Sequence, residues 1–507
     1  MKALFWLNWL FISVAAAAGV AWAAPLSDTT QECLDCHVLI NPGIVKDWES
    51  SRHASVTPKT AMAAEALSRK VSSPSVPDPL LDVAVGCAEC HTLRPQAHAD
   101  TFEHNGYEIH VVVSPADCRT CHSEEANQYD KNIMAHAWNN LAGNEVYKAL
   151  ERSIIGQPAL TGDTVSFKPA DADTRAEACY YCHGTRLEVT GTEMRDTDAG
   201  ELEFPVIAGW PNQGVGRINL DGSRGACSAC HTRHGFSIEM ARKPYTCKEC
   251  HIGPDVPAFK VYSASKHGNI ASAMGDQWNF KAVPWTVGSD FTAPTCAACH
   301  VSLLVNDDGE PIVPRTHQMN NRLAWRLFGL IYAHPHPLSP DTTIIRNAAG
   351  LPLPTDFDGT PASAHLIDPN EQARRTRAMQ AICLGCHDTS WVKGHWRRFE
   401  NTIRTTNADV HSLTRIMTTI WAEGWASGLA AGANPFDEAV EKQWADAWLF
   451  YANTIRFASA MAGGGDYGVF ADGRYALSRQ IVDLQDWLTI RRHMGSSLKP
   501  ANRKPND

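Results

Sequence analysis

The sequence has no cysteine outside its Cys-x-x-Cys pairs, no second long apolar run and no excess of basic residues. All 16 cysteines belong to eight such pairs, and a histidine directly follows each pair. No stretch after residue 23 is long and apolar enough to span a bilayer, which argues against a further membrane span. The formal net charge of -10 argues against nucleic acid as a partner.

The repeated segment Cys-x-x-Cys-His is the attachment site of a c-type haem. Its two thiols form thioether links to the porphyrin, and its histidine becomes the proximal ligand of the iron. Zinc ribbons and disulfide frameworks also use paired cysteines, but neither requires a histidine after every pair. We therefore predict eight covalently bound haem c groups, each with its iron. The predicted thiols are Cys33, Cys36, Cys87, Cys90, Cys118, Cys121, Cys179, Cys182, Cys227, Cys230, Cys247, Cys250, Cys296, Cys299, Cys383 and Cys386, and the proximal histidines are His37, His91, His122, His183, His231, His251, His300 and His387.

The N-terminal segment predicts export from the cytoplasm. A lysine at position 2 precedes an apolar stretch over residues 3–20, and Ala21-Trp22-Ala23 then forms an A-x-A cleavage motif. This is the pattern of a secretory signal peptide, with cleavage expected after Ala23; a retained membrane anchor is the alternative. Because bacteria attach c-type haem in the periplasm, the motif and the leader both predict a periplasmic protein without a membrane span after cleavage.

Haem packing changes what the length of the chain implies. Eight apolar porphyrins would replace side chains in the core, so little regular sheet is needed and long loops are tolerated. We expect an irregular, all-α multihaem cytochrome c fold with a haem-packed core and a C-terminal bundle of long helices. The predicted divisions are a signal peptide over 1–23, an octahaem-binding domain over 24–396 and a C-terminal helical domain over 397–507.

The pattern of residues 397–507 favours helices over 409–429, 436–461 and 475–494. Trp444, Trp448, Tyr451, Ile455 and Ala458 recur at alternating steps of four and three, which is helical spacing and more typical of a packed core than of a cofactor site. Earlier in the chain, helices are predicted over 42–53 and 123–138. The Pro-rich segment 334–361 is predicted to be a surface loop.

Fourteen histidines remain after the proximal eight, and electron-transfer haems often take a second histidine on the far face of the iron. Seven are predicted to serve there: His53, His110, His136, His234, His267, His317 and His395, with His104 competing with His110. A helix of about 15 residues spans about 22 Å, so His53, His136 and His267 should ligate a neighbouring haem. His234 lies three residues from His231 and points the same way on a helical turn, so a second haem must lie nearby.

Between His136 and His231 the only histidine is His183, the proximal residue of the fourth motif. The fourth haem therefore has no local distal candidate. We predict that it keeps an open coordination position for substrate.

These motifs resemble the octahaem hydroxylamine oxidoreductase family over essentially all of the mature sequence. The resemblance rests on the eight motifs, on residues 227–234 (CSACHTRH), 247–255 (CKECHIGPD) and 265–268 (SKHG), and on the haem-free tail. It implies seven bis-histidine haems, a five-coordinate fourth haem and a trimer built on the helical tails.

In that family an Asp-His pair follows the sixth haem motif and overhangs the catalytic iron. The matching residues here are Asp255 and Val256, so the carboxylate is present and the imidazole is not. Oxidising hydroxylamine releases protons that a histidine accepts well near neutral pH. Its loss weakens the case for oxidation, whereas Asp255 can still deliver protons to a bound nitrogen oxide. The alternative is that Asp255 is an ordinary carboxylate in a turn.

Oxidative members of the family also cross-link a tyrosine of a neighbouring subunit to the catalytic haem. The best match is Tyr467, in residues 463–468 (GGGDYG), although it can equally be an ordinary loop tyrosine. We thus predict a catalytic set of His183, Asp255 and Tyr467.

The sequence supports two main hypotheses of function. The first is an enzyme that acts on hydroxylamine or nitrite, with reduction to ammonium slightly favoured over oxidation. It exchanges electrons with a partner cytochrome or a quinol-linked donor or acceptor. The second is an electron conduit in which every iron is six-coordinate. Reduction of another oxyanion, such as a sulfur compound, is a third interpretation.

Overall fold

The computed structural model describes residues 24–197, 200–429, 432–463 and 465–494. The predicted signal peptide, residues 1–23, lies outside the described residues. Within them the chain is mostly helical, and no described helix is long and apolar enough to cross a membrane. The expectation of an irregular, mainly α-helical fold is confirmed.

The helices of the region that holds the first seven motifs are short. They are α1 (Asp28–Ile40), α2 (Pro42–Glu49), α3 (Arg52–Ser55), α4 (Pro58–Met62), α5 (Asp78–Leu81), α6 (Cys87–His91), α7 (Pro115–Cys118), α8 (Ser123–Asp130), α9 (Ala137–Ala142), α10 (Glu145–Ile155), α11 (Ala172–Glu177), α12 (Cys179–His183), α13 (Ile238–Arg242), α14 (Pro244–Lys248), α15 (Ala258–Ala264), α16 (Lys266–Met274) and α17 (Cys296–His300). Long connections join them, as expected where cofactors replace side chains in the core. The predicted helix over 42–53 is interrupted, because α2 ends at Glu49 and Ser51 caps the separate α3.

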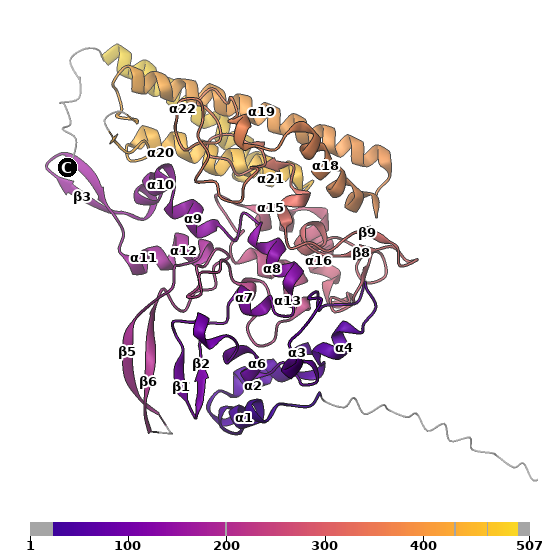
Figure 1. Cartoon of the computed structure of the whole chain (residues 1–507). Coiled ribbons are helices and arrows are strands. Elements are labelled where there is room, and N and C mark those ends of the chain that lie inside the picture. The colour runs from indigo at the N-terminus through magenta and orange to yellow at the C-terminus, as the bar shows by residue number, and fades with distance from the viewer. Residues whose placement is uncertain (1–23, 198–199, 430–431, 464, 495–507) are drawn as a thin grey trace, which may run out of the picture.

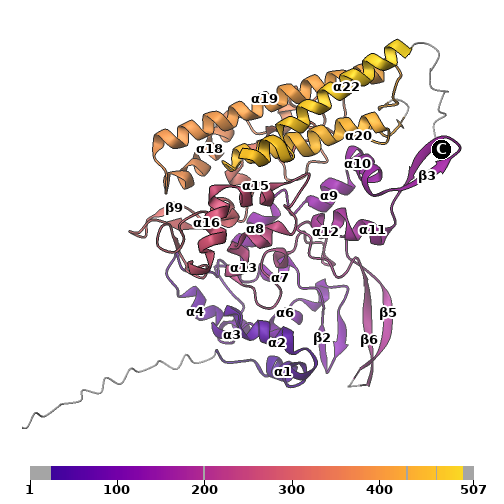
Figure 2. The ribbon, with the colours of Figure 1, turned by 180° about the vertical axis from the view of Figure 1, so that it is seen from behind.

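The strands form small sheets of two or three strands. The hairpins are β1 (Phe102–His104) with β2 (Tyr107–Ile109), β3 (Gln157–Thr161) with β4 (Thr164–Lys168), β5 (Glu188–Thr197) with β6 (Gly200–Ala208), and β10 (Trp325–Arg326) with β11 (His334–Pro335). A three-stranded sheet has the order β7 (Trp285–Thr286), β8 (Leu304–Val305), β9 (Pro311–Val313). In Figures 1 and 2, β5 and β6 extend from the body beside β1 and β2.

The C-terminal helices lie along one side of the molecule, above the short helices (Figures 1 and 2). They are α18 (Pro369–Leu384), α19 (Thr389–Ala422), α20 (Ala439–Asp446), α21 (Ala452–Ala460) and α22 (Arg474–Met494), with π-helical turns η7 (Ala447–Tyr451) and η8 (Tyr467–Ala471). The predicted domain boundary after residue 396 falls inside the 34-residue helix α19, so helix α19 belongs to both parts.

The tail has its own hydrophobic core, and the tryptophan stripe lies in it. Trp444, Trp448 and Ile455 are fully or almost fully buried and pack against Val410, Leu413, Met417 and Ile420 of α19 and Leu477, Leu484 and Leu488 of α22. The same core includes Leu353, from the segment 334–361 predicted to be a surface loop, and Leu330 and Tyr332 just before it; His334 and His336 of that segment are also buried. That prediction is wrong for its buried residues, because the segment is covered between the tail and the short helices.

Candidate functional site

The histidines of the Cys-x-x-Cys-His segments are oriented as metal ligands are. Metal-binding histidines usually place one ring nitrogen against an acceptor and leave the other for the metal. Four segments have this arrangement, with Nδ1 as the held nitrogen. The contacts are His37 Nδ1 to Asn41 Oδ1 at 2.8 Å, His91 to the His110 carbonyl at 2.7 Å, His122 to the Lys70 carbonyl at 3.0 Å and His183 to the Ala137 carbonyl at 3.3 Å. Nε2 of each ring is therefore the atom left to bind iron.

Five of these histidines face a second histidine at the spacing that an iron requires, one of them being His91, whose ring lies 6.1 Å from that of His110. Two metal–nitrogen bonds of about 2 Å, with about 1.2 Å from each nitrogen to its ring centre, give about 6.4 Å between rings. The other observed separations are 6.1 Å for His37 and His104, 6.2 Å for His53 and His122, 6.4 Å for His231 and His317, and 6.1 Å for His267 and His387. The residues thus fit haem irons with two imidazole ligands.

The predicted exchange of ligands between motifs agrees with these pairs. His53 faces His122 rather than His37, and His267 faces His387 rather than His251. His234 lies near His91, since the pKa of His234 is lowered first by burial and then by the charge of His91. Each candidate therefore lies beside the proximal histidine of a motif other than the nearest one.

His110, predicted as a distal ligand, faces His91 at a ring separation of 6.1 Å, but its ring nitrogens contact backbone carbonyls. Its Nδ1 lies 3.2 Å from the Val112 carbonyl and its Nε2 lies 2.9 Å from the Leu93 carbonyl, so no ring nitrogen is left for a metal. The competing His104 faces His37 instead. It ends β1 in a tight hairpin whose turn, Asn105-Gly106, has positive φ at both residues. An Asn-Gly pair between short strands was the sequence signal for this position.

His136 also differs from the expectation. The predicted helix over 123–138 ends at Asp130, and the chain turns before α9 begins at Ala137. This turn brings the Nε2 of His136 to 2.9 Å from the Asp130 carbonyl. Among the described residues that line the central cavity, His136 is absent. The ligation of an iron by His136 stays a prediction, with Nδ1 as the ring nitrogen that the Asp130 carbonyl leaves free.

Two histidines outside the seven predicted second ligands take up ligand-like positions. His334 and His336 are almost fully buried, and the Nδ1 atoms lie 2.7 and 3.1 Å from the carbonyls of the prolines that follow. Burial lowers the pKa of both to about 3, so both rings are neutral, as ligation requires. The alternation His-Pro-His-Pro, which sends both histidines to one face of an extended segment, was the available signal.

These groups surround one very large cavity. Its volume is about 2990 Å³, against about 300–1,000 Å³ for an ordinary ligand pocket. The histidines on its wall are His53, His122, His183, His231, His251, His267, His300, His317, His334, His336, His387 and His395. A void of this size lined by cysteine pairs and histidines fits several porphyrins side by side.

Asp255 lies in the part of the cavity around His183. Its negative charge opposes the lowering of the His183 pKa and the His251 pKa that burial causes, and it adds to the raised pKa of Cys179. The Nδ2 of Asn453, from α21, donates to the Asp255 carbonyl at 3.0 Å. The tail thus fixes the backbone of Asp255 beside the fourth motif.

Within one chain, Tyr467 lies apart from His183 and the fourth motif. It begins η8, next to α15, and is half-buried; among the described residues of the cavity wall it is absent. Burial raises its pKa, and Asp472 adds to that rise. Within one chain, Tyr467 and His183 are therefore not brought together.

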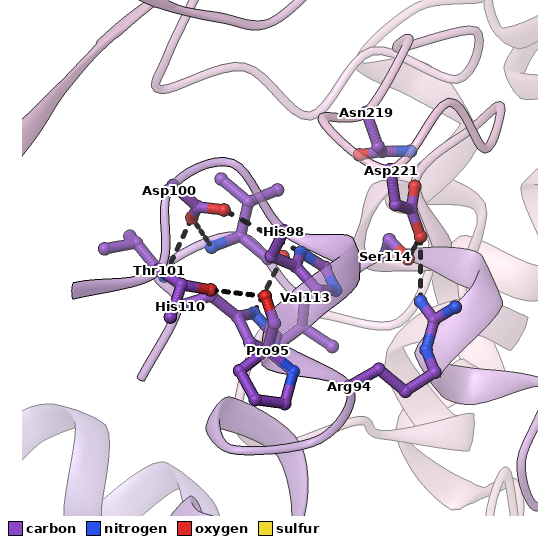
Figure 3. A network of polar contacts seen from close by, with 12 residues as sticks. Arg94, Pro95, His98, Asp100, Thr101, His110, Val113, Ser114, Asn219 and Asp221 are labelled. Atoms are coloured by element: carbon purple, nitrogen blue, oxygen red, sulfur yellow. Dashed lines mark hydrogen bonds and ion pairs between the residues drawn. The ribbon is translucent and has the colours of Figure 1, made fainter. Parts of the chain in front are cut away.

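His110 belongs instead to a buried polar network beside the second and third motifs (Figure 3). The His98 and His110 rings stack at 3.7 Å, and His98 Nε2 lies 3.2 Å from Asp117 Oδ1. The guanidinium of Arg94 donates to Asp117 at 2.7 Å and to Asp221 at 2.8 Å. Because the His110 carbonyl accepts from His91, this network also fixes a proximal histidine.

The charge of His98 should make stability depend on pH. Burial alone would lower the pKa of His98, but Asp100 and Asp117 outweigh burial and raise it to about 9. The folded pKa lies above the unfolded value of about 6.5, so the stabilisation is complete below about pH 6.5 and is lost as pH rises through 9. We expect His98→Gln to lower the free energy of unfolding at pH 6 by about 2 kcal/mol and to flatten its decline up to pH 10. Denaturant unfolding followed by circular dichroism measures both; the exposed His493→Gln is the control, and an unchanged profile in His98→Gln contradicts the assignment.

The comparisons with known proteins agree with this arrangement. The family described as "Seven times multi-haem cytochrome CxxCH" matches residues 201–315, and the one described as "Cytochrome c554 and c-prime" matches residues 117–203. A solved structure titled "Hypothetical multiheme protein" is 39% identical, with a TM-score of 0.87, over 94% of this chain and 98% of that chain.

Two relatives come from Kuenenia stuttgartiensis. A chain of its reducing HAO-like protein complex shares the fold, with a TM-score of 0.60 and 17% identity over 92% of this chain and 86% of that chain. A curated protein named "Probable nitrite reductase-hydroxylamine oxidoreductase fusion protein" is 24% identical over 285 residues. This match covers 53% of the present chain and only 25% of the fusion protein.

Proposed function

We propose that this chain, which belongs to the multihaem cytochromes c, is a periplasmic, hydroxylamine oxidoreductase-like oxidoreductase of small nitrogen compounds. The proposed substrates are nitrite and hydroxylamine. The proposed partner is a redox cytochrome or a quinol-linked donor or acceptor. Binding of haem c and a role in electron transfer follow from the family; the substrate, the number of haems and the direction are our proposal.

We propose eight haems, one for each Cys-x-x-Cys-His segment. The facing rings of His37 and His104, His53 and His122, His231 and His317, and His267 and His387 support four with two histidine ligands. His234 is the proposed second ligand opposite His91. The sixth and seventh haems have His251 and His300 as proximal ligands. We propose that two of the three histidines His334, His336 and His395, which line the same cavity, are their second ligands. Among the described residues, no histidine ring faces His183 at the spacing of the four pairs, which supports an open position there.

The observation that carries the proposal is the position of Asp255 beside His183. A carboxylate next to a metal centre with an open face can deliver protons to a bound ligand. An open haem iron at this position would supply the exchange of electrons with the nitrogen of the substrate. The chain itself contributes the Asp255 carboxylate, the fixed backbone that Asn453 provides and a cavity that encloses the reacting groups.

We propose that the reaction runs towards ammonium. Converting nitrite to ammonium consumes six electrons and eight protons and releases two waters, so it needs both an electron relay and a proton donor. The histidine pairs hold the relay, the partner supplies the electrons, and Asp255 passes on protons. Val256, where oxidative members have a histidine, removes the second proton acceptor that hydroxylamine oxidation would use. Oxidation of hydroxylamine remains the alternative direction.

One observation favours the second function, an electron conduit. Three proximal histidines, His183, His251 and His300, have no facing histidine ring among the described residues. His334, His336 and His395 line the cavity and face no proximal histidine in the pairs above. If one of them reached the iron at His183, every iron would be six-coordinate and no substrate position would remain.

The ferric spectrum distinguishes the two functions. We expect about one haem in eight to be high-spin and to shift on addition of cyanide or hydroxylamine, and reduced protein to form ammonium from nitrite. A wholly low-spin spectrum that neither ligand changes, with no ammonium formed, would establish the conduit and exclude the enzyme.

We further propose that the chain forms a trimer through its helical tails and that Tyr467 would reach a neighbouring subunit's site if it forms a cross-link. Mass spectrometry of the haem peptide containing Cys179 and His183 tests this arrangement. A covalently attached peptide that includes Tyr467 argues for oxidation, whereas its absence together with ammonium formation argues for reduction.

A further inference from the structure

A half-buried arginine lies in the same part of the cavity as Asp255. Arg326 ends the two-residue strand β10, and β11 holds it in place through the pairing of Arg326 with His334. The side chain lines the cavity together with His183 and Asp255. Its positive charge acts on both His183 and His251, because it adds to the lowering of each pKa that burial causes. The guanidinium therefore lies close to the fourth and sixth motifs.

Within the described residues, no carboxylate forms an ion pair with Arg326. Its neighbours are Tyr147 of α10, whose hydroxyl interacts electrostatically with Arg326, and the ring of Phe328, whose centre is 5.5 Å from the guanidinium carbon. Burial lowers the pKa of Arg326, and the interaction with Tyr147 opposes that change. A partly buried charge without a counter-ion costs free energy, so this site favours an anion brought in from outside.

Two buried arginines, Arg322 and Arg375, differ from Arg326 in how their donors are used. Arg322 donates to the backbone carbonyls of Cys299, Ser302 and Pro314, and Arg375 pairs with Glu371. The donors of these two residues are thus used by the fold. Arg326 lines the cavity, where a planar oxyanion can accept two parallel hydrogen bonds from a guanidinium.

We propose that Arg326, assisted by the Tyr147 hydroxyl, binds the oxygen atoms of a small oxyanion, nitrite, at the site beside His183. This inference rests on the proposed function and narrows it, because hydroxylamine carries no negative charge and gains little from a guanidinium. Arg326 and Asp255 then have different tasks: the cation binds and orients the anion, and the carboxylate moves protons.

Equilibrium titration of the ferric protein with nitrite and, separately, with hydroxylamine tests the proposal, with the Soret band as the readout. We expect Arg326→Gln to weaken nitrite binding at least about tenfold and hydroxylamine binding less than about threefold. Arg326→Lys keeps the charge but loses the planar fork, so its nitrite affinity should fall between those of the parent and Arg326→Gln. Tyr147→Phe should weaken nitrite binding about threefold.

Arg52→Gln is the matched control, because Arg52 also lines the cavity but lies next to His53. Haem content and circular dichroism verify that each variant is folded. Equal loss of nitrite and hydroxylamine binding in Arg326→Gln, or no loss of either, overturns the assignment and leaves the proposed function intact. No loss of either is the result expected if Arg326 pairs with a haem propionate. A parent protein whose spectrum neither ligand changes overturns both.

Discussion

Asp255→Asn is expected to slow turnover of nitrite or hydroxylamine about a hundredfold or more, with haem content and absorption spectrum unchanged. The amide keeps the size of the side chain and leaves the hydrogen bond from Asn453 to the backbone carbonyl in place. It cannot carry a proton between solvent and substrate. Turnover therefore falls because proton delivery is lost, while binding of the substrate to the iron is retained.

Steady-state kinetics with an artificial reductant, together with the haem spectrum, measure this effect. Asp276→Asn is a suitable control, because Asp276 is exposed and, among the described residues, does not line the cavity. Unchanged turnover in Asp255→Asn removes Asp255 from the mechanism and leaves it the turn carboxylate that its Gly-Pro-Asp context also allows.

His104→Gly is expected to convert one low-spin haem to high-spin, and the same change at His110 is not. His104 faces His37 at 6.1 Å, so its removal opens one face of an iron. Both ring nitrogens of His110 contact backbone carbonyls, so His110→Gly loosens the buried network around His98 instead. Electron paramagnetic resonance at low temperature counts the high-spin haems directly.

Added imidazole provides the control for this comparison. It should enter the cavity left by His104→Gly and restore the low-spin signal, and it should leave the His110→Gly spectrum unchanged. A new high-spin signal in His110→Gly, with none in His104→Gly, would reverse the assignment and return His110 to the role that its position before Cys118 suggested.

The proximal half of the site could be predicted from sequence because the chemistry is local. A thioether linkage fixes the order of two cysteines and a histidine within five residues, so no tertiary information is needed. The second ligands depend on how distant segments meet. Local sequence context was sufficient to predict His53, His267 and His317. The choice between His104 and His110 depended on a hairpin turn, and the position of His136 depended on where α8 ends.

A different limit of sequence-based prediction is seen at His334, His336 and Arg326. All three lie in or next to a segment whose prolines predict a surface loop, and all three line the cavity because the tail helices cover that segment. Periodicity predicted the tail helices and their buried tryptophans. It could not predict that helix α19 continues without interruption from the last haem motif into the tail.

That continuity decides how the protein can be divided. A cut after residue 396 would leave only the first two turns of α19 attached to the last motif, and helices that short are marginal in water. It would also remove Asn453 from the Asp255 carbonyl and uncover Leu330, Tyr332 and Leu353. The C-terminal helices are thus no detachable module: truncation at this point would produce an insoluble fragment rather than a smaller working cytochrome.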